Sequence, residues 1–171
     1  EKDVRRLVVK FGGSSLSDGA KISRAINSVI KKAKEGTQIV VVVSAMGKTT
    51  DILIEATMQA CGDAPSAEML DDILAMGERT SARIFSAGLK SHGWKSVYLD
   101  PDDPNWPIIT DDRFNDARPI LNICEENIRK VIEPMLEDGV IVVVPGFIGK
   151  TMDGRITTIG RGGSDITAFI L

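Results

Sequence analysis

Long apolar runs are missing from this sequence of 171 residues. The most apolar segments, 39–43 and 140–144, are strand-sized and fall well short of the ~20 residues that a membrane-spanning helix needs. The first residues, 1–6, lack the apolar stretch and small-residue cleavage site of a signal peptide. We therefore expect a cytoplasmic protein that does not bind a membrane.

Cysteine, histidine and aromatic residues are also scarce. Cys61 and Cys124 form no C-x-x-C pair, so neither a disulfide framework nor a zinc site is expected. The single histidine, His92, lies beside a glycine in an expected turn and cannot complete a Ser/His/Asp or Cys/His nucleophile arrangement. A pI near 5.2, a net charge of −3 and few aromatic residues argue against a nucleic-acid-binding surface.

What is present is an alternation of short apolar runs and segments with helical periodicity. A helix capped by Asp18 is expected to bury the stripe from Ile22 to Ala33 and to end at Gly36. Asp153 and Gly154 predict a hairpin turn between two short strands. Repeated strand–helix units indicate an α/β protein with a mostly parallel sheet. The expected strands are 7–11, 39–43, 96–99, 140–144 and 156–159, and the expected helices are 18–36, 50–60, 65–89 and 122–137.

Glycine-rich loops follow these strands at 12–13, 47, 146 and 160–163. In open α/β sheets ligands bind at the carboxyl ends of the strands, so this edge is the candidate site. Two familiar motifs fail there. A Walker phosphate loop ending in Gly47, Lys48 and Thr49 would need glycine where Val42 stands, and a dinucleotide fingerprint would need glycine in place of Asp165. The aspartates of 100–112 show no metal-ligand spacing and are expected to form a charged loop, so no metal site is predicted.

The residues 10–15 read Lys-Phe-Gly-Gly-Ser-Ser. A glycine pair lets backbone N–H groups approach an anion closely, and a lysine at the strand end adds a point charge for phosphate oxygens. The alternative is an edge lysine that reaches into solvent before an ordinary turn.

The loop 160–165 reads Gly-Arg-Gly-Gly-Ser-Asp. Arg161 offers a planar fork suited to a carboxylate or phosphate. Ser164 or Asp165 could equally serve only as a helix cap. Three glycines in four residues exceed what capping requires, which favours a functional loop.

Glu78 falls on the inward face of the helix expected at 65–89, beside Gly77 and Ser81. A buried carboxylate is costly unless it is paired, and the amine of a ligand would be a suitable partner. The alternatives are an internal pair with an arginine or lysine, or a helix stripe misplaced by one residue.

Five segments together resemble the aspartate kinases of the amino acid kinase family, in order and over nearly the whole chain. These segments are 10–15, 43–47 with Thr50, 77–79 with Ser81, 146–149 and 160–168. The resemblance implies a three-layer αβα sandwich with a mostly parallel sheet, as in carbamate kinase-like folds. It also implies transfer of a phosphoryl group from MgATP to the side-chain carboxylate of L-aspartate, the first step toward lysine, methionine and threonine. The alternatives are a family member acting on glutamate or acetylglutamate, and a non-catalytic amino-acid-binding module.

The same resemblance implies roles for individual residues. Lys10 would neutralise the transferring phosphoryl group, and Asp165 would orient the lysine side of the site. Gly12, Gly13 and Ser14 would donate to phosphate oxygens. Glu78 would bind the α-ammonium of aspartate and Arg161 its α-carboxylate. The substrate pocket would be completed by Ser44, Thr50, Phe147, Gly162, Gly163 and Ser164.

Only six residues follow Asp165, and the last four, 168–171, are apolar. In the family this loop leads into the nucleotide-binding half. We therefore expect residues 1–171 to be the amino-acid-binding lobe of a truncated kinase domain that is inactive alone. The missing half would hold most contacts to ATP and Mg²⁺, and the full-length enzyme is expected to be a homo-oligomer.

Overall fold

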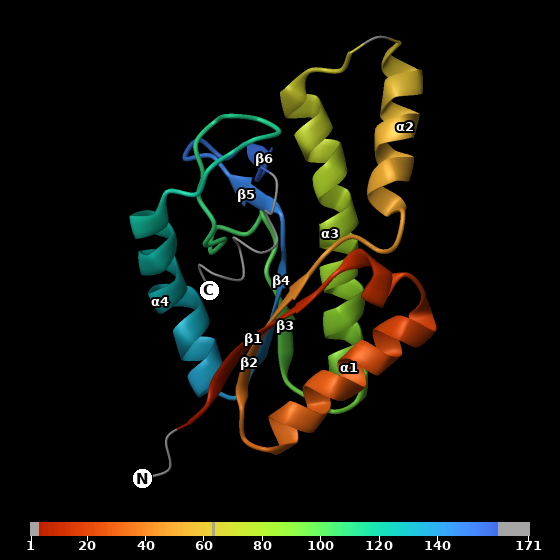
Figure 1. Ribbon diagram of the computed structural model, residues 1–171. Coiled ribbons are helices and arrows are strands. Elements are labelled where there is room, and N and C mark those ends of the chain that lie inside the picture. The colour runs from red at the N-terminus through yellow and green to blue at the C-terminus, as the bar shows by residue number, and fades with distance from the viewer. Residues whose placement is uncertain (1–3, 63, 161–171) are drawn as a thin grey trace.

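Four parallel strands form the central sheet of the computed structural model, which describes residues 4–62 and 64–160 (Figure 1). Every neighbouring pair in this sheet is parallel, as the alternating sequence pattern predicts. In spatial order the strands are β1 (Arg6–Phe11), β2 (Gln38–Val43), β4 (Ile141–Pro145) and β3 (Ser96–Tyr98). β4 therefore enters the sheet between two strands that precede it in the chain.

Helices cover both faces of this sheet, which explains why β2 after Gln38 and the whole of β4 are apolar. Helices α1 (Gly19–Lys34) and α3 (Ala67–Ser91) pack on one face against Val41 and Val143. Helix α4 (Leu121–Glu137) packs on the other face against Val142. Figure 1 shows the resulting three layers, so the predicted αβα sandwich is confirmed.

The helix ends follow the predicted signals. The Asp18 carboxylate accepts a hydrogen bond from the Lys21 amide (2.8 Å), and Ser66 caps α3 through the Met69 amide (3.1 Å). Gly36 follows α1 with φ of +85°, a conformation that favours glycine. Pro134 lies in the last turn of α4. Predicted and observed boundaries of the predicted elements differ by at most two residues.

Helix α2 (Thr49–Cys61) and the first half of α3 extend beyond the strand ends as a helical pair (Figure 1). Thr57 is the one residue of α2 that is buried. A membrane-crossing helix would have to be longer and more apolar than any found within residues 4–62 and 64–160.

A second, antiparallel sheet consists of β5 (Ile148–Lys150) and β6 (Ile156–Thr158), with Gly154 in the turn at φ +91°. The predicted hairpin is thus confirmed. Asp71 of α3 fastens it: its buried carboxylate accepts from the Thr158 amide (2.8 Å), the Thr158 hydroxyl (2.7 Å) and the Asn115 amide (2.9 Å). Burial nevertheless keeps the pKa of Asp71 above its ordinary value.

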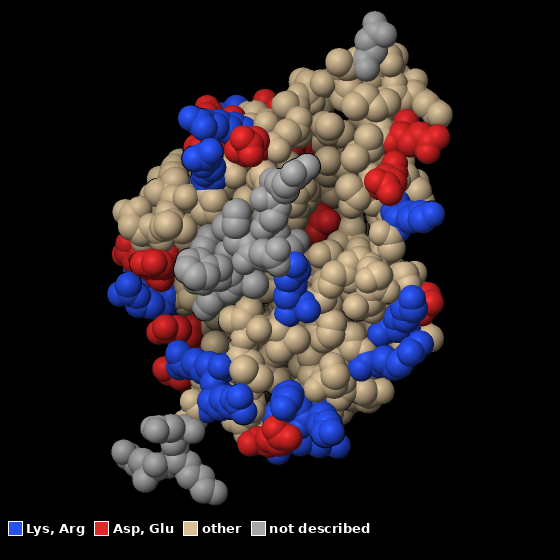
Figure 2. Space-filling model, viewed as in Figure 1, with Lys and Arg blue, Asp and Glu red and all other residues tan. Residues whose placement is uncertain are grey.

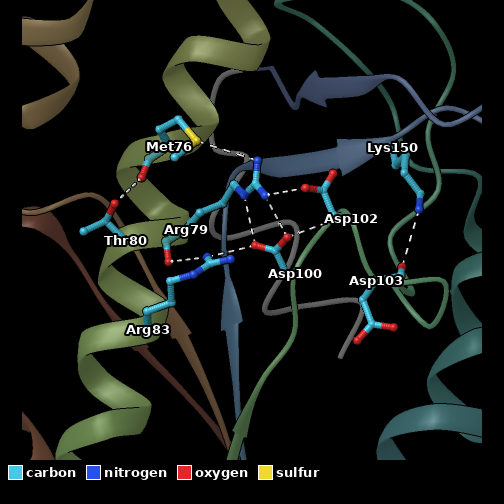
Figure 3. A network of polar contacts seen from close by, with 8 residues as sticks. All are labelled: Met76, Arg79, Thr80, Arg83, Asp100, Asp102, Asp103 and Lys150. Carbon is cyan, nitrogen blue, oxygen red and sulfur yellow. Dashed lines mark hydrogen bonds and ion pairs between the residues drawn. The ribbon is translucent and has the colours of Figure 1, made fainter.

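The expected charged loop at 100–112 is wrong in one respect, because Asp100 is buried. Arg79 donates to both of its carboxylate oxygens at 2.9 and 2.8 Å, and Arg83 lies 2.9 Å from it (Figure 3). These arginine hydrogen bonds hold the pKa of Asp100 below its ordinary value despite burial. The pair fastens α3 to the segment that follows β3.

We expect Asp100→Asn to lower the free energy of unfolding by about 2 kcal/mol, because it leaves the buried Arg79 charge with a neutral partner. Asp102→Asn is the matched control. Asp102 also contacts Arg79 (2.9 Å), but its side chain is 78% exposed, so its loss is worth little. Urea denaturation of both variants measures the difference; equal effects would contradict the buried role of Asp100.

Candidate amino-acid- and phosphate-binding site

The loops that follow β1, β2 and β4 lie side by side at one edge of the sheet. The Ser44 amide donates to Phe11 O (3.1 Å), and the Gly47 amide donates to Gly13 O (2.9 Å). The Gly146 amide donates to the end of β2 at Val43 O (2.9 Å). Three of the glycine loops singled out in the sequence are therefore neighbours in space. The fourth follows the β5–β6 hairpin, where Gly160 lies next to Asp116, and not a strand of the central sheet.

Ala45, in the loop after β2, packs against both Gly13 and Gly77. A Cβ atom at Gly13 would lie 3.0 Å from Ala45 O, and a Cβ atom at Gly77 would lie 2.8 Å from Ala45 Cβ. The loop after β2 is thus held between η1 (Gly13–Leu16) and the middle of α3. Glycine at both positions permits backbone approach that any side chain would obstruct.

Glu78 reaches into the same place. Its side chain is buried, and its Oε1 accepts a hydrogen bond from the Ala45 amide at 3.2 Å. Its Oε2 has no hydrogen-bond partner within residues 4–62 and 64–160. Burial raises the pKa of Glu78 to about 7, opposed only by the amides of Glu78 and Ala45. The inward orientation is confirmed, and the adjacent arginine, Arg79, is engaged by Asp100 instead.

The remaining predicted residues have different environments. Lys10 is exposed at the end of β1, Ser14 is exposed in η1, and Ser44 is half-buried directly after β2. Thr50 is half-buried in the first turn of α2. Phe147 has φ of +71°, which is rare for a bulky residue, and its carbonyl accepts from the Ile159 amide at 2.8 Å. Arg161, Gly162, Gly163, Ser164 and Asp165 lie outside the described residues.

Figure 2 shows one face of the molecule, with most charged side chains toward the rim and a recessed acidic surface near the centre. The site thus combines two electrostatic features. Backbone amides near Gly12 and Gly13, directly after β1, can bind an anion together with Lys10 at the end of that strand, whereas Glu78 can bind a cation.

Residues 5–171 match the model of the amino acid kinase family. The chain belongs to this family. It is 41% identical over 167 residues to an aspartokinase from Geobacillus stearothermophilus, covering 96% of this chain and 39% of that protein. It is also 41% identical to aspartokinase 2 from Bacillus subtilis (strain 168), with 96% and 38% covered. The chain thus spans about two fifths of the length of these relatives.

Solved structures of the amino acid kinase family agree with the fold. Escherichia coli aspartokinase III in complex with aspartate and ADP matches with a TM-score of 0.83 and 25% identity, covering 97% of this chain and 46% of that one. Aspartate kinase from Synechocystis matches with a TM-score of 0.74 and 32% identity, covering 95% of this chain and 25% of that one. The resemblance seen in the sequence motifs is confirmed, as is the fold.

A family member that uses ATP needs places for phosphate and for Mg²⁺. At Gly12 the space around an added Cβ is open, so a phosphate oxygen could approach the backbone there, whereas Gly13 is packed against the backbone of Ala45 and Gly47. The described part of the chain contains no group of three or more His, Cys, Asp or Glu residues that could hold a metal ion.

The sequence pattern did not indicate the structural roles of two residues, Asp71 and Asp100. Asp71 and Glu78 are seven residues apart, so the helical period that located Glu78 could also have located Asp71. Arg79 belongs to the segment 77–79 of the family resemblance, but its partner Asp100 lies in a loop without helical or strand periodicity. That pairing carries no local sequence signal.

We expect Gly77→Ala to destabilise the protein by roughly 1–3 kcal/mol, because the new methyl group would overlap Ala45 and force the loop after β2 to shift. Gly19→Ala, also in a helix but with no atom within 4 Å of the added Cβ, is the control and should be neutral or stabilising. Thermal unfolding of both variants tests this. If Gly77→Ala were as stable as Gly19→Ala, the loop after β2 could shift without loss of stability, which would contradict the prediction.

Proposed function

We propose that the protein is an aspartate kinase and that residues 1–171 supply its amino-acid-binding lobe. One observation carries the proposal. The Glu78 side chain is buried beside the glycine-containing loops that follow β1 and β2, and one of its carboxylate oxygens has no hydrogen-bond partner in the described residues. A free amino acid brings the ammonium that such an oxygen requires. Support comes from relatives named aspartokinase that match 96% of this chain. Their greater length leaves room for a separate nucleotide-binding lobe.

The proposed roles divide the site between amino acid and phosphate. Glu78 binds the α-ammonium group of L-aspartate, and Arg161 binds its α-carboxylate through a planar fork. Lys10 and the backbone amides of Gly12 and Gly13, with the Ser14 hydroxyl, bind the γ-phosphoryl oxygens. Asp165 orients the lysine. The pocket wall consists of Ser44, Thr50, Phe147, Gly162, Gly163 and Ser164.

In the proposed reaction an oxygen of the aspartate side-chain carboxylate attacks the γ-phosphorus of ATP. The bond from that phosphorus to the β–γ bridging oxygen breaks, ADP leaves with the electron pair, and 4-phospho-L-aspartate forms. No general base is required, because a carboxylate with an ordinary pKa near 4 is already ionised at neutral pH. The protein's task is to position the two substrates and neutralise charge. Bound Mg²⁺ would supply further charge neutralisation.

Isothermal titration calorimetry on the 171-residue chain tests the amino-acid site. We expect binding of L-aspartate and much weaker binding of D-aspartate, N-acetyl-L-aspartate and succinate, because the last two lack a free ammonium group. Preference for L-glutamate or N-acetyl-L-glutamate would favour another family member. Phosphoryl transfer is tested on the full-length protein by trapping the acyl phosphate with hydroxylamine. Aspartate binding without any transfer would favour a non-catalytic binding module.

The remaining assignments are part of the same proposal. The enzyme would act in the cytoplasm, where ATP and free amino acids are available, and would use MgATP. The full-length protein would be a homo-oligomer. Size-exclusion chromatography with light scattering on that protein measures its assembly state.

A further inference from the structure

Two buried side-chain oxygens in the described part of the chain lack any hydrogen-bond partner: Glu78 Oε2 and Ser81 Oγ. Their residues are 4% and 3% exposed. The two residues are three positions apart on α3, so they lie on the same face of the helix, one turn from each other. Buried polar atoms without partners are rare and costly, and two of them on one face of a helix mark a place where an interaction is to be made.

The hydroxyl of Ser81 differs from four other hydroxyls on helices, and also from that of Ser86 on the same helix, which bonds to the Ser96 hydroxyl (2.8 Å). Four others donate back to a carbonyl of their own helix, the usual way in which a helical serine or threonine satisfies itself. One of them belongs to Thr80, the adjacent residue, so the local backbone does not prevent such a bond. The four bonds are Ser28 to Ala25 O (2.7 Å), Thr57 to Leu53 O (2.7 Å), Thr80 to Met76 O (2.8 Å) and Ser91 to Ala87 O (3.0 Å).

The position of Ser81 does not call for a polar group. It lies on the inward stripe of α3 between Gly77 and Phe85, and the next residue, Ala82, is fully buried in the core. Alanine would occupy such a position without a desolvation cost. A hydroxyl there offsets its desolvation cost only if it forms a hydrogen bond. Glu78 Oε2, one helical turn away, is buried and also lacks a hydrogen-bond partner in the described residues.

We propose that Ser81 is a positioning residue for the amino-acid site, donating its hydroxyl proton to Glu78 Oε2 once Glu78 is ionised. The inference rests on the proposed function, in which Glu78 binds the substrate ammonium. Rotation about a single side-chain torsion redirects a serine hydroxyl. A carboxylate has about four acceptor positions. The Ala45 amide occupies one, Ser81 takes a second, and the others remain directed at the ligand.

The first test needs no ligand. The ¹³C resonance of the Glu78 carboxyl, assigned with Glu78→Gln, is followed by NMR from pH 4 to 9 in the 171-residue chain. A hydroxyl that donates to the ionised form lowers the midpoint, so we expect Ser81→Ala to raise the pKa of Glu78 by about one unit. Ser81→Thr keeps the hydroxyl and should titrate like the original protein. An unchanged midpoint in Ser81→Ala overturns the proposal.

The second test uses calorimetry with L-aspartate at several pH values. We expect Ser81→Ala to weaken binding about 5-fold near pH 7, because a smaller fraction of Glu78 is then ionised, with the loss shrinking above pH 9 and Ser81→Thr restoring affinity. Thr80→Ala is the matched control, since the Thr80 hydroxyl is bonded to its own helix. A loss that is equal at every pH would mean a packing defect and would overturn the proposal.

The two tests also separate this proposal from the function on which it rests. If the original chain binds no L-aspartate, the proposed function fails in this chain, while the ligand-free titration still decides the role of Ser81. If Ser81→Ala does not fold, Ser81→Cys replaces it, because a thiol has nearly the same shape and is a much weaker donor. If the Glu78 titration midpoint in Ser81→Cys then equals that of the original protein, the proposal is overturned.

Discussion

Lys10→Ala is expected to lower kcat of the full-length protein by about 10²–10³-fold, the typical cost of removing a preorganised donor from developing charge. The proposed role is charge neutralisation on the transferring phosphoryl group. The Lys10 side chain is exposed at the end of β1, so its removal leaves no cavity in the core. Hydroxamate formation measures the rate, and circular dichroism with a thermal melt measures the fold.

Lys31→Ala is the control for this experiment, since Lys31 is an exposed lysine in the last part of α1. It should alter neither rate nor stability. Lys10→Arg should recover part of the rate, because it keeps the charge but changes the geometry of the donor. A Lys10→Ala enzyme with near-normal kcat would refute the proposed role.

Glu78→Gln is expected to weaken L-aspartate binding by about 10²–10³-fold. The change removes the charge that faces the substrate ammonium in a desolvated place, and such losses commonly cost 2–5 kcal/mol. The amide keeps an acceptor oxygen for the Ala45 amide, so the loop after β2 should keep its position. Calorimetry on the chain measures affinity. Glu125→Gln, an exposed carboxylate on α4, is the control.

The raised pKa of Glu78, about 7, predicts opposite pH trends for binding and for stability. Affinity for L-aspartate should rise as pH increases through 7, because only ionised Glu78 attracts the ammonium. Without ligand, the contribution of Glu78 to stability is fully present below pH 4.5 and is lost as pH rises through 7, by about 3 kcal/mol in total. Glu78→Gln should remove both trends. Urea denaturation at pH 5 and pH 8 measures the second, and a trend that persists in Glu78→Gln would contradict its assignment to this residue.

Much of the fold could be predicted because its signals are local. The runs at 39–43 and 140–144 are apolar at every position, which is typical of strands covered on both faces. Asp18 and Ser66 precede periodic apolar stripes and cap helices as expected. The inward direction of Glu78 followed from the same helical period.

Features that depend on distant contacts could not be predicted from the sequence. Arg79 and Asp100 are 21 residues apart, and nothing near either residue indicates the other. The backbone of Phe147 adopts a positive φ because of its surroundings, since phenylalanine itself disfavours it. Glycine is needed at position 77 because Ala45, 32 residues earlier in the chain, packs against it. The roles proposed for residues 161–165 stay predictions.

The strand order of the sheet also constrains how the chain can fold during synthesis. β1, α1 and β2 form a local unit that can assemble early, but within residues 4–62 and 64–160 the only strand that pairs with β3 is β4. β4 begins at Ile141, 43 residues after β3 ends at Tyr98. Until the ribosome has released β4, β3 lacks its strand partner and one edge of β2 is open. The sheet therefore closes late through a long-range pairing, a topology that slows folding and extends the exposure of strand edges.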